Sequence, residues 1–370
     1  MKRITHNGLI VLTLTFTLLI FGLVGIYSSS KVWAKYLYDD SFYYFKRQFI
    51  FILIGLILLF IGSRINKKHL YKYSNLLLLF GLILLILVLI PGIGVERNGS
   101  RSWFAIGSLA IQPAEIFKVC MIIYASKYLS SNYESSKKFY STIIPLLIVT
   151  LIGFGLIMFQ PDLGTGLVLV CSIVVMTLVS RVSFKNYIFL GVGALLCFTF
   201  VVISEPYRMS RITSYINPWE DPLGSGFQII QAMYSIVPGG ILGQGINNSI
   251  QKCFYLPEPQ TDFIFAIMCE EIGLIGGLFI IATFILLFIY LFKIAFNSKS
   301  LFTMFLSIGV VSLIAIQVII NLGVVVGLLP VTGITLPFIS YGGSSVTILL
   351  FLIGLVIGDE KESLDEDING

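Results

Sequence analysis

The sequence contains few of the residues that metal sites and nucleic-acid surfaces need. Among 370 residues there are two histidines, five cysteines and 12% charged residues. The cysteines are Cys120, Cys171, Cys197, Cys253 and Cys269. They show no Cys-x-x-Cys or Cys/His spacing, and both histidines, His6 and His69, lie in flanking segments, so neither a structural metal site nor a histidine base is expected. The net charge of +5 comes without a basic stripe interleaved with exposed aromatic residues, so we expect no nucleic-acid partner.

Long apolar runs take up most of the chain, which is 57% hydrophobic. Runs of about 20 residues are long enough to cross the roughly 30 Å hydrocarbon core of a bilayer. Because the backbone in lipid must satisfy its own hydrogen bonds, such runs are expected to be helices. The predicted spans are residues 8–28, 46–63, 74–93, 112–129, 141–160, 164–180, 185–204, 263–294, 302–329 and 336–358. The sequence therefore predicts an all-α polytopic membrane protein with about ten transmembrane helices.

The domain organisation follows from these spans. Residues 1–358 are predicted to form a single integral-membrane domain, and the acidic residues 359–370 a solvated, disordered tail. An even number of spans places both termini on one side of the membrane. The short loops on that side carry Arg64, Lys67, Lys68, Lys72, Lys127, Lys137, Lys138, Arg181, Lys185, Lys293 and Lys299. The positive-inside rule makes this side the cytoplasm, although the first outer loop also holds four basic residues.

One outer segment, residues 205–262, is far longer than the other connections, and loops of that length in a compact fold are usually functional. Within it Phe227, Ile230, Tyr234 and Val237 recur at helical spacing. This pattern predicts an amphipathic helix that lies on the membrane surface. The alternative is a helix that only covers the bundle.

Asp262 stands at the mouth of the eighth predicted span. Thr261 and Asp262 are both residues that favour a helix N-cap. The alternative is a carboxylate in a functional cavity, because Glu258 lies upstream and Glu270 and Glu271 lie about two turns into the same span, where buried charge is costly. At 100° per residue, Glu270 and Glu271 are predicted to serve different surfaces.

The stretch NGSRSWFAIGSLAIQPAEIFK holds a second group of polar residues. Pro113 suits the first turn of a helix. Glu115 and Lys118 are spaced i,i+3 on that helix, which predicts an ion pair inside the bilayer. The pair either neutralises itself or forms a polar cavity wall with Arg101 and Trp103 at its outer rim. Trp103 could equally belong to an interfacial aromatic belt.

Two further outer turns interrupt the apolar pattern. In QPDLGTG, Asp162 is expected either to cap the sixth span or to belong to a site. In LLPVTGITLPFISYGGSS, prolines and glycines break the backbone at membrane depth, which survives only where protein or a wet cavity surrounds it. A helix that restarts at Gly342, with Ser344 and Ser345 in its first turn, would offer free N–H groups to a diphosphate. The alternative is tight packing of small residues.

Four motifs together carry a family resemblance. NGSRSWFAIG with QPAEIFK, QPDLGT, YLPEPQTDFIFAI and LPFISYGGSS resemble signatures of the SEDS family, which comprises the FtsW, RodA and SpoVE proteins. They occur in the family order between about residues 97 and 345, and the wording is closest to the FtsW/SpoVE branch. One departure is Gln260, where many members have histidine before Thr-Asp.

The resemblance implies a peptidoglycan glycosyltransferase of the bacterial cytoplasmic membrane, used in cell division or sporulation. Such an enzyme polymerises lipid II, an undecaprenyl-diphosphate-linked disaccharide peptide, into β-1,4 glycan strands at the outer face. It works beside a class B penicillin-binding protein transpeptidase and other divisome or elongation proteins. The family's essential aspartate corresponds to Asp262, its polar cavity pair to Glu115 and Lys118, and its outer tryptophan to Trp103.

Family chemistry is a single inverting displacement, which needs one base and groups that stabilise the departing diphosphate. Asp262 is the candidate catalytic base. The candidate substrate-binding residues are Arg101, Trp103, Glu115, Lys118, Asp162, Arg208, Arg211, Glu258, Ser344 and Ser345. The cofactor is unknown, with a divalent cation (Mg or Mn) held by carboxylates as one alternative to the arginines.

Two other function classes are compatible with the sequence. A lipid II flippase would also use broken helices and buried ionisable residues. The polar motifs cluster at the outer face, whereas a flippase also needs polar groups at the inner mouth, so the enzyme is favoured. A catalytically silent scaffold would require Asp262 to be dispensable.

Overall fold

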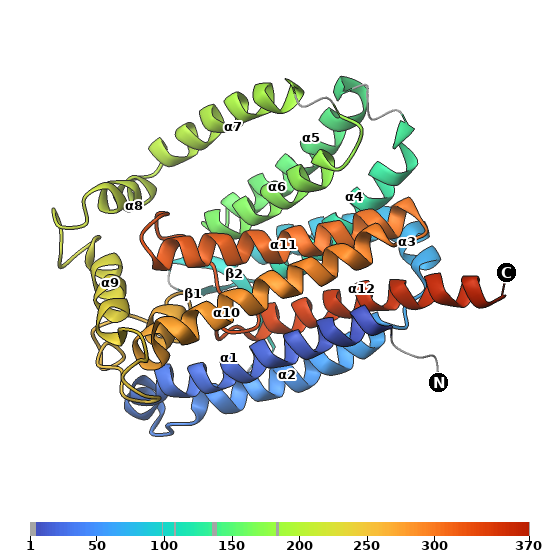
Figure 1. The fold of residues 1–370 in the computed structure, drawn as a ribbon. Helices are drawn as coiled ribbons and strands as arrows, with labels where there is room; N and C mark the ends of the chain where they lie inside the picture. The colour runs from blue at the N-terminus through green and yellow to red at the C-terminus, as the bar shows by residue number, and fades with distance from the viewer. Residues whose placement is uncertain (1–4, 98, 107–108, 135–138, 183–184, 370) are drawn as a thin grey trace.

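The computed structural model describes residues 5–97, 99–106, 109–134, 139–182 and 185–369. Its helices are α1 (His6–Tyr38), α2 (Tyr43–Gly62), α3 (Lys67–Leu89), α4 (Pro113–Ser131), α5 (Phe139–Met158), α6 (Leu163–Leu178), α7 (Lys185–Ile203), α8 (Pro206–Ile216), α9 (Phe227–Gly239), α10 (Ile264–Phe296), α11 (Leu301–Val325) and α12 (Gly343–Asn369). Helix α1 begins and α12 ends at the same end of the bundle, whereas α8 and α9 lie at the opposite end (Figure 1).

Each of the ten predicted spans coincides with a helix, so the prediction of an all-α polytopic membrane protein is confirmed. Within the described residues, α1, α2, α3, α10 and α11 are long and apolar enough to cross a membrane, and shorter apolar helices cover Thr142–Met158, Leu163–Leu178 and Gly343–Gly358. The number of spans and the side of the termini stay predictions. Of the basic residues used for orientation, Lys137 and Lys138 lie outside the described residues.

The core of the bundle forms around α11 and the first half of α12. Helix α11 packs against α4, α6, α10 and α12, and 78% of its most apolar window is buried. In α2 and α3 the corresponding buried share is 22%, and their outward faces are apolar, as lipid-facing helices require. The bundle therefore has a protein-enclosed centre and a lipid-facing periphery.

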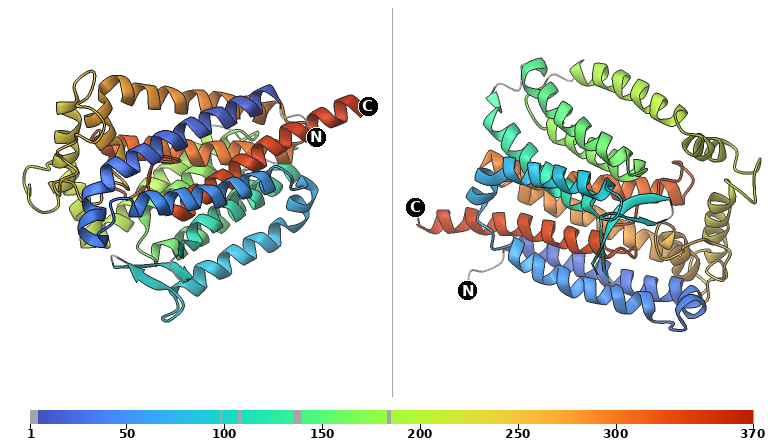
Figure 2. Two further views of the ribbon diagram at one scale, coloured as in Figure 1. Left: turned by 90° about the horizontal axis from the view of Figure 1, so that it is seen from below. Right: turned by 180° about the vertical axis from the view of Figure 1, so that it is seen from behind.

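A small antiparallel sheet connects α3 to α4 and was not expected from the apolar pattern. Its strands are β1 (Val95–Arg97), β2 (Ser100–Ile106) and β3 (Leu109–Ile111), in that order. Figure 2 shows the sheet beyond the ends of α3 and α4 that lie away from the chain termini. The Asn-Gly dipeptide before β2 is a strong hairpin signal, and Gly99 has φ 76°. The Asn-Gly dipeptide was therefore a signal for the hairpin that the hydropathy pattern did not carry and that the prediction did not use.

The last predicted span and the tail differ from expectation. Residues 326–342 are not helical, and α12 begins at Gly343 rather than at residue 336. The tail prediction was wrong, because residues 359–369 continue α12 as helix. Extending an existing helix costs far less than nucleating one, and this stretch contains no proline or glycine to stop it.

The apolar residues of α9 divide between two faces. Ile229, Ile230 and Ala232 are buried, while Tyr234 and Val237 are 48% and 77% exposed. Helix α9 packs against α10, so its buried face covers the bundle. That the exposed apolar residues lie on a membrane surface stays a prediction.

Helix α10 is broken at Gly273, which has φ 67° and ψ −171°. In a continuous helix the amides of Leu274 and Ile275 would bond the carbonyls of Glu270 and Glu271. Here those four groups pair with residues 240–245 instead. Gln244 N donates to Glu270 O (3.0 Å), Gly245 N to Glu271 O (2.9 Å), Leu274 N to Gly240 O (2.9 Å) and Ile275 N to Ile241 O (3.2 Å). We call residues 240–263, between α9 and α10, the return segment.

Replacing Gly273 by alanine is expected to destabilise the fold. An added Cβ would lie 2.3 Å from Gly243 N and 2.5 Å from Ile241 O, at a positive φ. The backbone strain alone costs about 1–3 kcal/mol. We expect a lower midpoint of thermal unfolding in detergent. Gly155→Ala, where an added Cβ meets nothing within 4 Å, is the matched control. Equal midpoints for the two variants would contradict this account of the break.

Candidate active site

A cavity of about 1340 Å³ lies at the end of the bundle that carries the sheet and α8. Its walls come from the end of α1, the start of α2, β2, α4, α6, α8, the return segment and residues 329–345. Ordinary small-molecule pockets are about 300–1,000 Å³, so this cavity has room for a larger head group. Nine of the eleven predicted site residues line it, namely Trp103, Glu115, Asp162, Arg208, Arg211, Glu258, Asp262, Ser344 and Ser345.

Two non-helical stretches, the return segment and residues 326–342, lie side by side and satisfy each other's backbone. Tyr341 N donates to Gln260 O (2.9 Å), and Ser340 Oγ donates to Thr261 O (2.7 Å). The Asn321 amide donates to both Asp262 O (2.8 Å) and Ile334 O (2.7 Å). This confirms the expectation that broken backbone in the bundle lines a cavity, and the bonds between the two stretches meet part of their hydrogen-bonding requirement.

Asp262 does not cap α10. The helix begins at Ile264, and the N-cap position, Phe263, makes no side-chain capping bond. The Asp262 side chain faces the cavity next to Gly333, where an added Cβ would lie 3.7 Å from Oδ2. The capping prediction was therefore wrong, because the backbone near Asp262 is satisfied by Asn321 and the carboxylate is left for the cavity.

The surroundings of Asp262 raise its pKa from 3.8 to about 6. Burial is the main cause, since a desolvated carboxylate favours its neutral form. The nearby charges of Glu258 and Asp162 raise it further, and Arg211 lowers it. Asp262 belongs to the return segment, outside the helical spans, and its carboxyl group exchanges a proton near neutral pH.

Asp162 caps α6, as one of its two predicted roles requires, and it also lines the cavity. It is the N-cap of α6, where Oδ1 accepts from Thr165 N (3.0 Å). Its second oxygen accepts from Gln112 Nε2 (2.8 Å), which ties α6 to the start of α4. The residue also lines the cavity, so the cap holds a negative charge at the wall.

The Glu115–Lys118 ion pair is confirmed. Lys118 Nζ lies 2.7 Å from Glu115 Oε1, and the side chains are 1% and 7% exposed. Glu115 lines the cavity, whereas Lys118 lies behind it. Within the described part of the chain, Glu115 Oε2 has no hydrogen-bond partner. The pair thus presents one free carboxylate oxygen to the wall rather than an ammonium group.

Arg101 was wrongly expected to lie at the rim of this cavity. The β1–β2 register places it opposite Glu96, and its guanidinium lies 3.4 Å from the Glu96 carboxylate. The hairpin therefore pairs the Arg101 guanidinium with Glu96, and Arg101 is not among the residues that line the cavity. Trp103, two residues further along β2, does line the cavity.

Two of the groups at the start of α12 that were expected to be free for a diphosphate, Gly342 N and Ser344 Oγ, are bonded to other protein groups. Gly342 N donates to Gln48 Oε1 (3.2 Å). Ser344 Oγ donates to Ala110 O (2.9 Å) and accepts from Gln112 N (3.3 Å). The restart of the helix at Gly343 is confirmed, but Ser344 joins α12 to β3 and α4, while Ser345 lines the cavity.

Two cavity residues escaped the sequence interpretation. Arg47, in the first turns of α2, lines the wall with its guanidinium carbon 4.6 Å from the centre of the Tyr43 ring. An arginine inside an apolar span was the available signal. Gln260 also lines the cavity, and within the described residues its Oε1 is buried without a partner.

Fold and site together define a polytopic membrane protein with a large cavity at one end of the bundle that combines carboxylates and arginines. The model of the FtsW/RodA/SpoVE family, described as a cell cycle protein, matches residues 9–363. The chain is 48% identical over 359 residues to stage V sporulation protein E of Bacillus subtilis, covering 97% of this chain and 98% of that protein. It belongs to the FtsW/RodA/SpoVE family, the SEDS family of the motifs above.

Other relatives agree with this assignment. The probable peptidoglycan glycosyltransferase FtsW of Geobacter metallireducens is 38% identical over 358 residues, covering 96% of this chain and 95% of that protein. A chain from the structure of a peptidoglycan synthase complex superimposes with a TM-score of 0.78 at 30% identity, covering 95% of this chain and 97% of that one. Rod shape determining protein RodA of Thermus thermophilus gives 0.71 at 26% identity, with 95% and 96% covered.

Lys118→Met is expected to destabilise the protein strongly, because it leaves the buried Glu115 carboxylate unpaired. Breaking one partner of a buried pair costs about 3–5 kcal/mol. The double variant Glu115→Gln, Lys118→Met should recover most of the loss in a thermal unfolding measurement. Lys46→Met, which breaks an exposed pair with Asp40, is the control and should cost about 0–1 kcal/mol. Equal losses for Lys118→Met and Lys46→Met would refute the buried-pair account.

Proposed function

We propose that this protein is a peptidoglycan glycosyltransferase that polymerises lipid II. Family membership and relatives named as probable peptidoglycan glycosyltransferases support this. The observation that carries it is the Asp262 carboxylate, which makes no helix cap, faces the cavity and has a pKa of about 6. A carboxylate with these properties is suited to accept a hydroxyl proton at neutral pH.

In the proposed reaction, the 4-hydroxyl of the acceptor sugar transfers its proton to Asp262. Its oxygen forms a bond to the anomeric carbon of the donor sugar. The bond from that carbon to the lipid diphosphate breaks, and the diphosphate leaves with the electron pair. Attack from the opposite face converts the α-linked donor into a β-1,4 link, so one displacement inverts the configuration.

Arginines on two walls of the cavity are the proposed partners of the diphosphates. Arg208 and Arg211 come from α8, and Arg47 comes from α2. Arg211 Nη1 donates to Val331 O (2.6 Å), which fixes the guanidinium against residues 326–342. Preorganised cations stabilise a leaving diphosphate without reorganising during the reaction. Because two lipid-linked substrates must bind together, cations on opposite walls suit the chemistry.

The carboxylates of the cavity do not form a ready cation site. Among the described residues, no three His, Cys, Asp or Glu side chains come together as ligands. A Mg²⁺ site built by the protein needs several oxygen ligands in near-octahedral geometry. With a diphosphate substrate, however, Mg²⁺ needs only one or two protein carboxylates, so a divalent cation that binds together with the substrate stays a proposal; the steps proposed above use the arginines.

We further propose that the cavity faces the outside of the cell and that the protein works with a class B penicillin-binding protein. The chain ends lie at the end of the bundle opposite to the cavity (Figure 1), and the basic loops favour the cytoplasm for that end. A structural neighbour comes from a peptidoglycan synthase complex, which supports a transpeptidase partner.

Asp262→Asn is expected to abolish polymerisation of labelled lipid II, measured with and without the transpeptidase partner. Loss of a general base removes about 10²–10⁴-fold of the rate. The variant should stay folded, because an acid whose pKa rises on folding loses stability as the pH climbs from 3.8 toward about 6, and asparagine avoids that loss. Asp221→Asn, at an exposed turn, is the control.

The same experiment separates the enzyme from a flippase. If wild type and Asp262→Asn both fail to polymerise but both move lipid II across vesicles, the glycosyltransferase proposal fails and transport replaces it. Full activity of Asp262→Asn would remove this residue from the site.

The rate of polymerisation is expected to rise with pH through about 6 and then to level off. Asp262 acts as a base only when it is ionised, and its pKa is about 6. The initial rate measured between pH 5 and pH 8 tests this. A midpoint near 4, the ordinary range of an aspartate, would contradict the desolvated environment of Asp262.

A further inference from the structure

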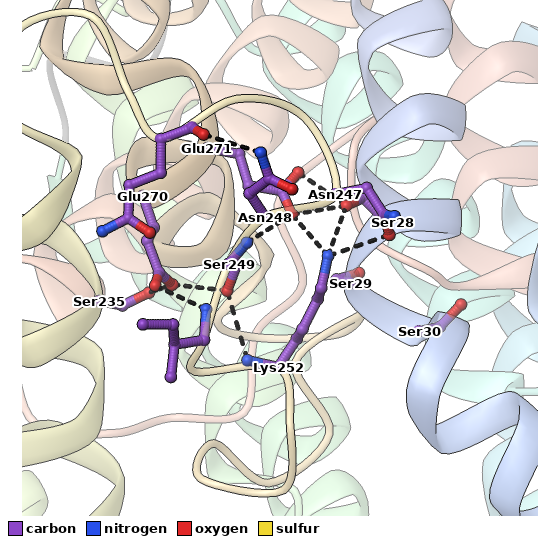
Figure 3. Close-up of polar contacts among 12 residues, drawn as sticks. Ser28, Ser29, Ser30, Ser235, Asn247, Asn248, Ser249, Lys252, Glu270 and Glu271 are labelled. Atoms are coloured by element: carbon purple, nitrogen blue, oxygen red, sulfur yellow. Dashed lines mark hydrogen bonds and ion pairs between the residues drawn. The ribbon is translucent and has the colours of Figure 1, made fainter.

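A cluster of buried polar side chains lies outside the cavity, where the proposed chemistry does not use it (Figure 3). Its centre is the pair Glu270 and Glu271, on α10, which are 1% and 4% exposed. Neither lines the cavity. Buried carboxylates in an apolar helix are costly unless they are fully paired, so their partners indicate what they hold.

Glu271 joins α10 to α1 and to the return segment. Ser28 Oγ, on α1, lies 2.6 and 2.7 Å from its two oxygens. Lys252 Nζ, on the return segment, lies 2.9 Å from Oε1, and both side chains of this ion pair are 4% exposed. Lys252 Nζ also donates to Asn247 Oδ1 (3.1 Å) and to Ser28 Oγ (3.2 Å).

Glu270 joins α10 to α9 and to the same segment. Its Oε2 accepts from Ser235 Oγ (3.2 Å) and from Ser249 Oγ (2.5 Å). Its Oε1 accepts from Ile250 N (2.8 Å). The two carboxylates therefore serve different surfaces, as the helical geometry predicted. We call Glu270, Glu271, Lys252 and their serine partners the carboxylate latch.

The latch lies directly beside the broken turn of α10. Residues 240–245 already occupy the backbone positions freed at Gly273. Residues 239–243 pack tightly against the broken turn of α10. An added Cβ at Gly239 would lie 2.2 Å from Cys269 O, and one at Gly243 would lie 2.2 Å from Glu271 O. The backbone bonds of residues 240–245 and the side-chain bonds of the carboxylate latch therefore hold the return segment against α10 on both sides of residues 253–269.

That stretch is the loop that carries the candidate base. Asp262 lies between Lys252 and Glu271 in the sequence, so their ion pair closes a loop around it. Glu258 and Gln260, which line the cavity, lie on the same loop. An error in the position of a reacting group of about 1 Å can cost 10²-fold in rate, so the position of this loop is a catalytic requirement.

We propose that Lys252 and Glu271 are positioning residues, which hold Asp262 in the cavity by closing the loop between them. The proposal rests on the proposed role of Asp262 for its kinetic consequence. Its structural consequence, a fastened return segment, can be measured without any activity.

The test compares Lys252→Met, Glu271→Gln and the double variant with wild type in detergent or nanodiscs. Hydrogen exchange of peptides from residues 240–263 is measured together with kcat and KM for labelled lipid II. Lys35→Met is the matched control, because it makes the same change at an exposed ion pair with Asp39.

Lys252→Met is expected to speed exchange in residues 240–263 while the other helices keep their protection. It should lower kcat by about 10- to 100-fold with little change in KM, since Lys252 touches no substrate. Adding Glu271→Gln should recover thermal stability, because the double variant no longer buries an unpaired charge. It should restore neither the exchange protection of residues 240–263 nor kcat, because the loop still lacks the ion pair that closes it. Lys35→Met should match wild type.

Wild-type exchange and kcat in Lys252→Met would overturn the proposal, and so would a loss of protection spread evenly over the molecule. A fall in kcat with unchanged exchange would show a chemical role instead. If wild type itself does not polymerise lipid II, the proposed function fails, and the exchange measurement alone then decides whether the latch fastens the segment.

Discussion

The fold depends on one constraint, which is that backbone polar groups inside an apolar bundle must be paired with other protein groups. Helices meet this constraint alone, but this chain contains two long non-helical stretches within the bundle. The return segment takes over the amides and carbonyls that α10 frees at Gly273, and it also pairs with residues 326–342. The two stretches are joined by hydrogen bonds, and their junction forms a wall of the cavity.

The same constraint assigns different tasks to the carboxylates. Glu115 is paired with Lys118, Asp162 caps α6, and Glu271 is held by Ser28 and Lys252. Asp262 is different, because its backbone is satisfied by Asn321 while its carboxylate is neither ion-paired to a lysine nor used as a cap. Asp262 is half-buried, and partial desolvation without such a partner raises the pKa of an acid, which is the property a general base needs.

Interactions within a few residues of each other were predictable from the sequence. The Glu115–Lys118 pair follows from i,i+3 spacing, and the Asp162 cap follows from an aspartate before Leu-Gly-Thr. The ten apolar segments follow from composition alone. The hairpin that places Arg101 opposite Glu96 was missed even though it is local, because the hydropathy pattern gives no signal for it. The packing of α9 against α10 depends on the tertiary structure.

The sequence by itself determined the helical segments, the family motifs and nine of the residues that line the cavity, because these depend on local propensity, hydropathy and short motifs. Only the tertiary structure decided that Asp262 is left uncapped, that Arg47 shares its cavity, and that Lys252 reaches Glu271. These outcomes depend on which backbone groups remain unpaired after the helices pack, and that is settled between segments far apart in the chain.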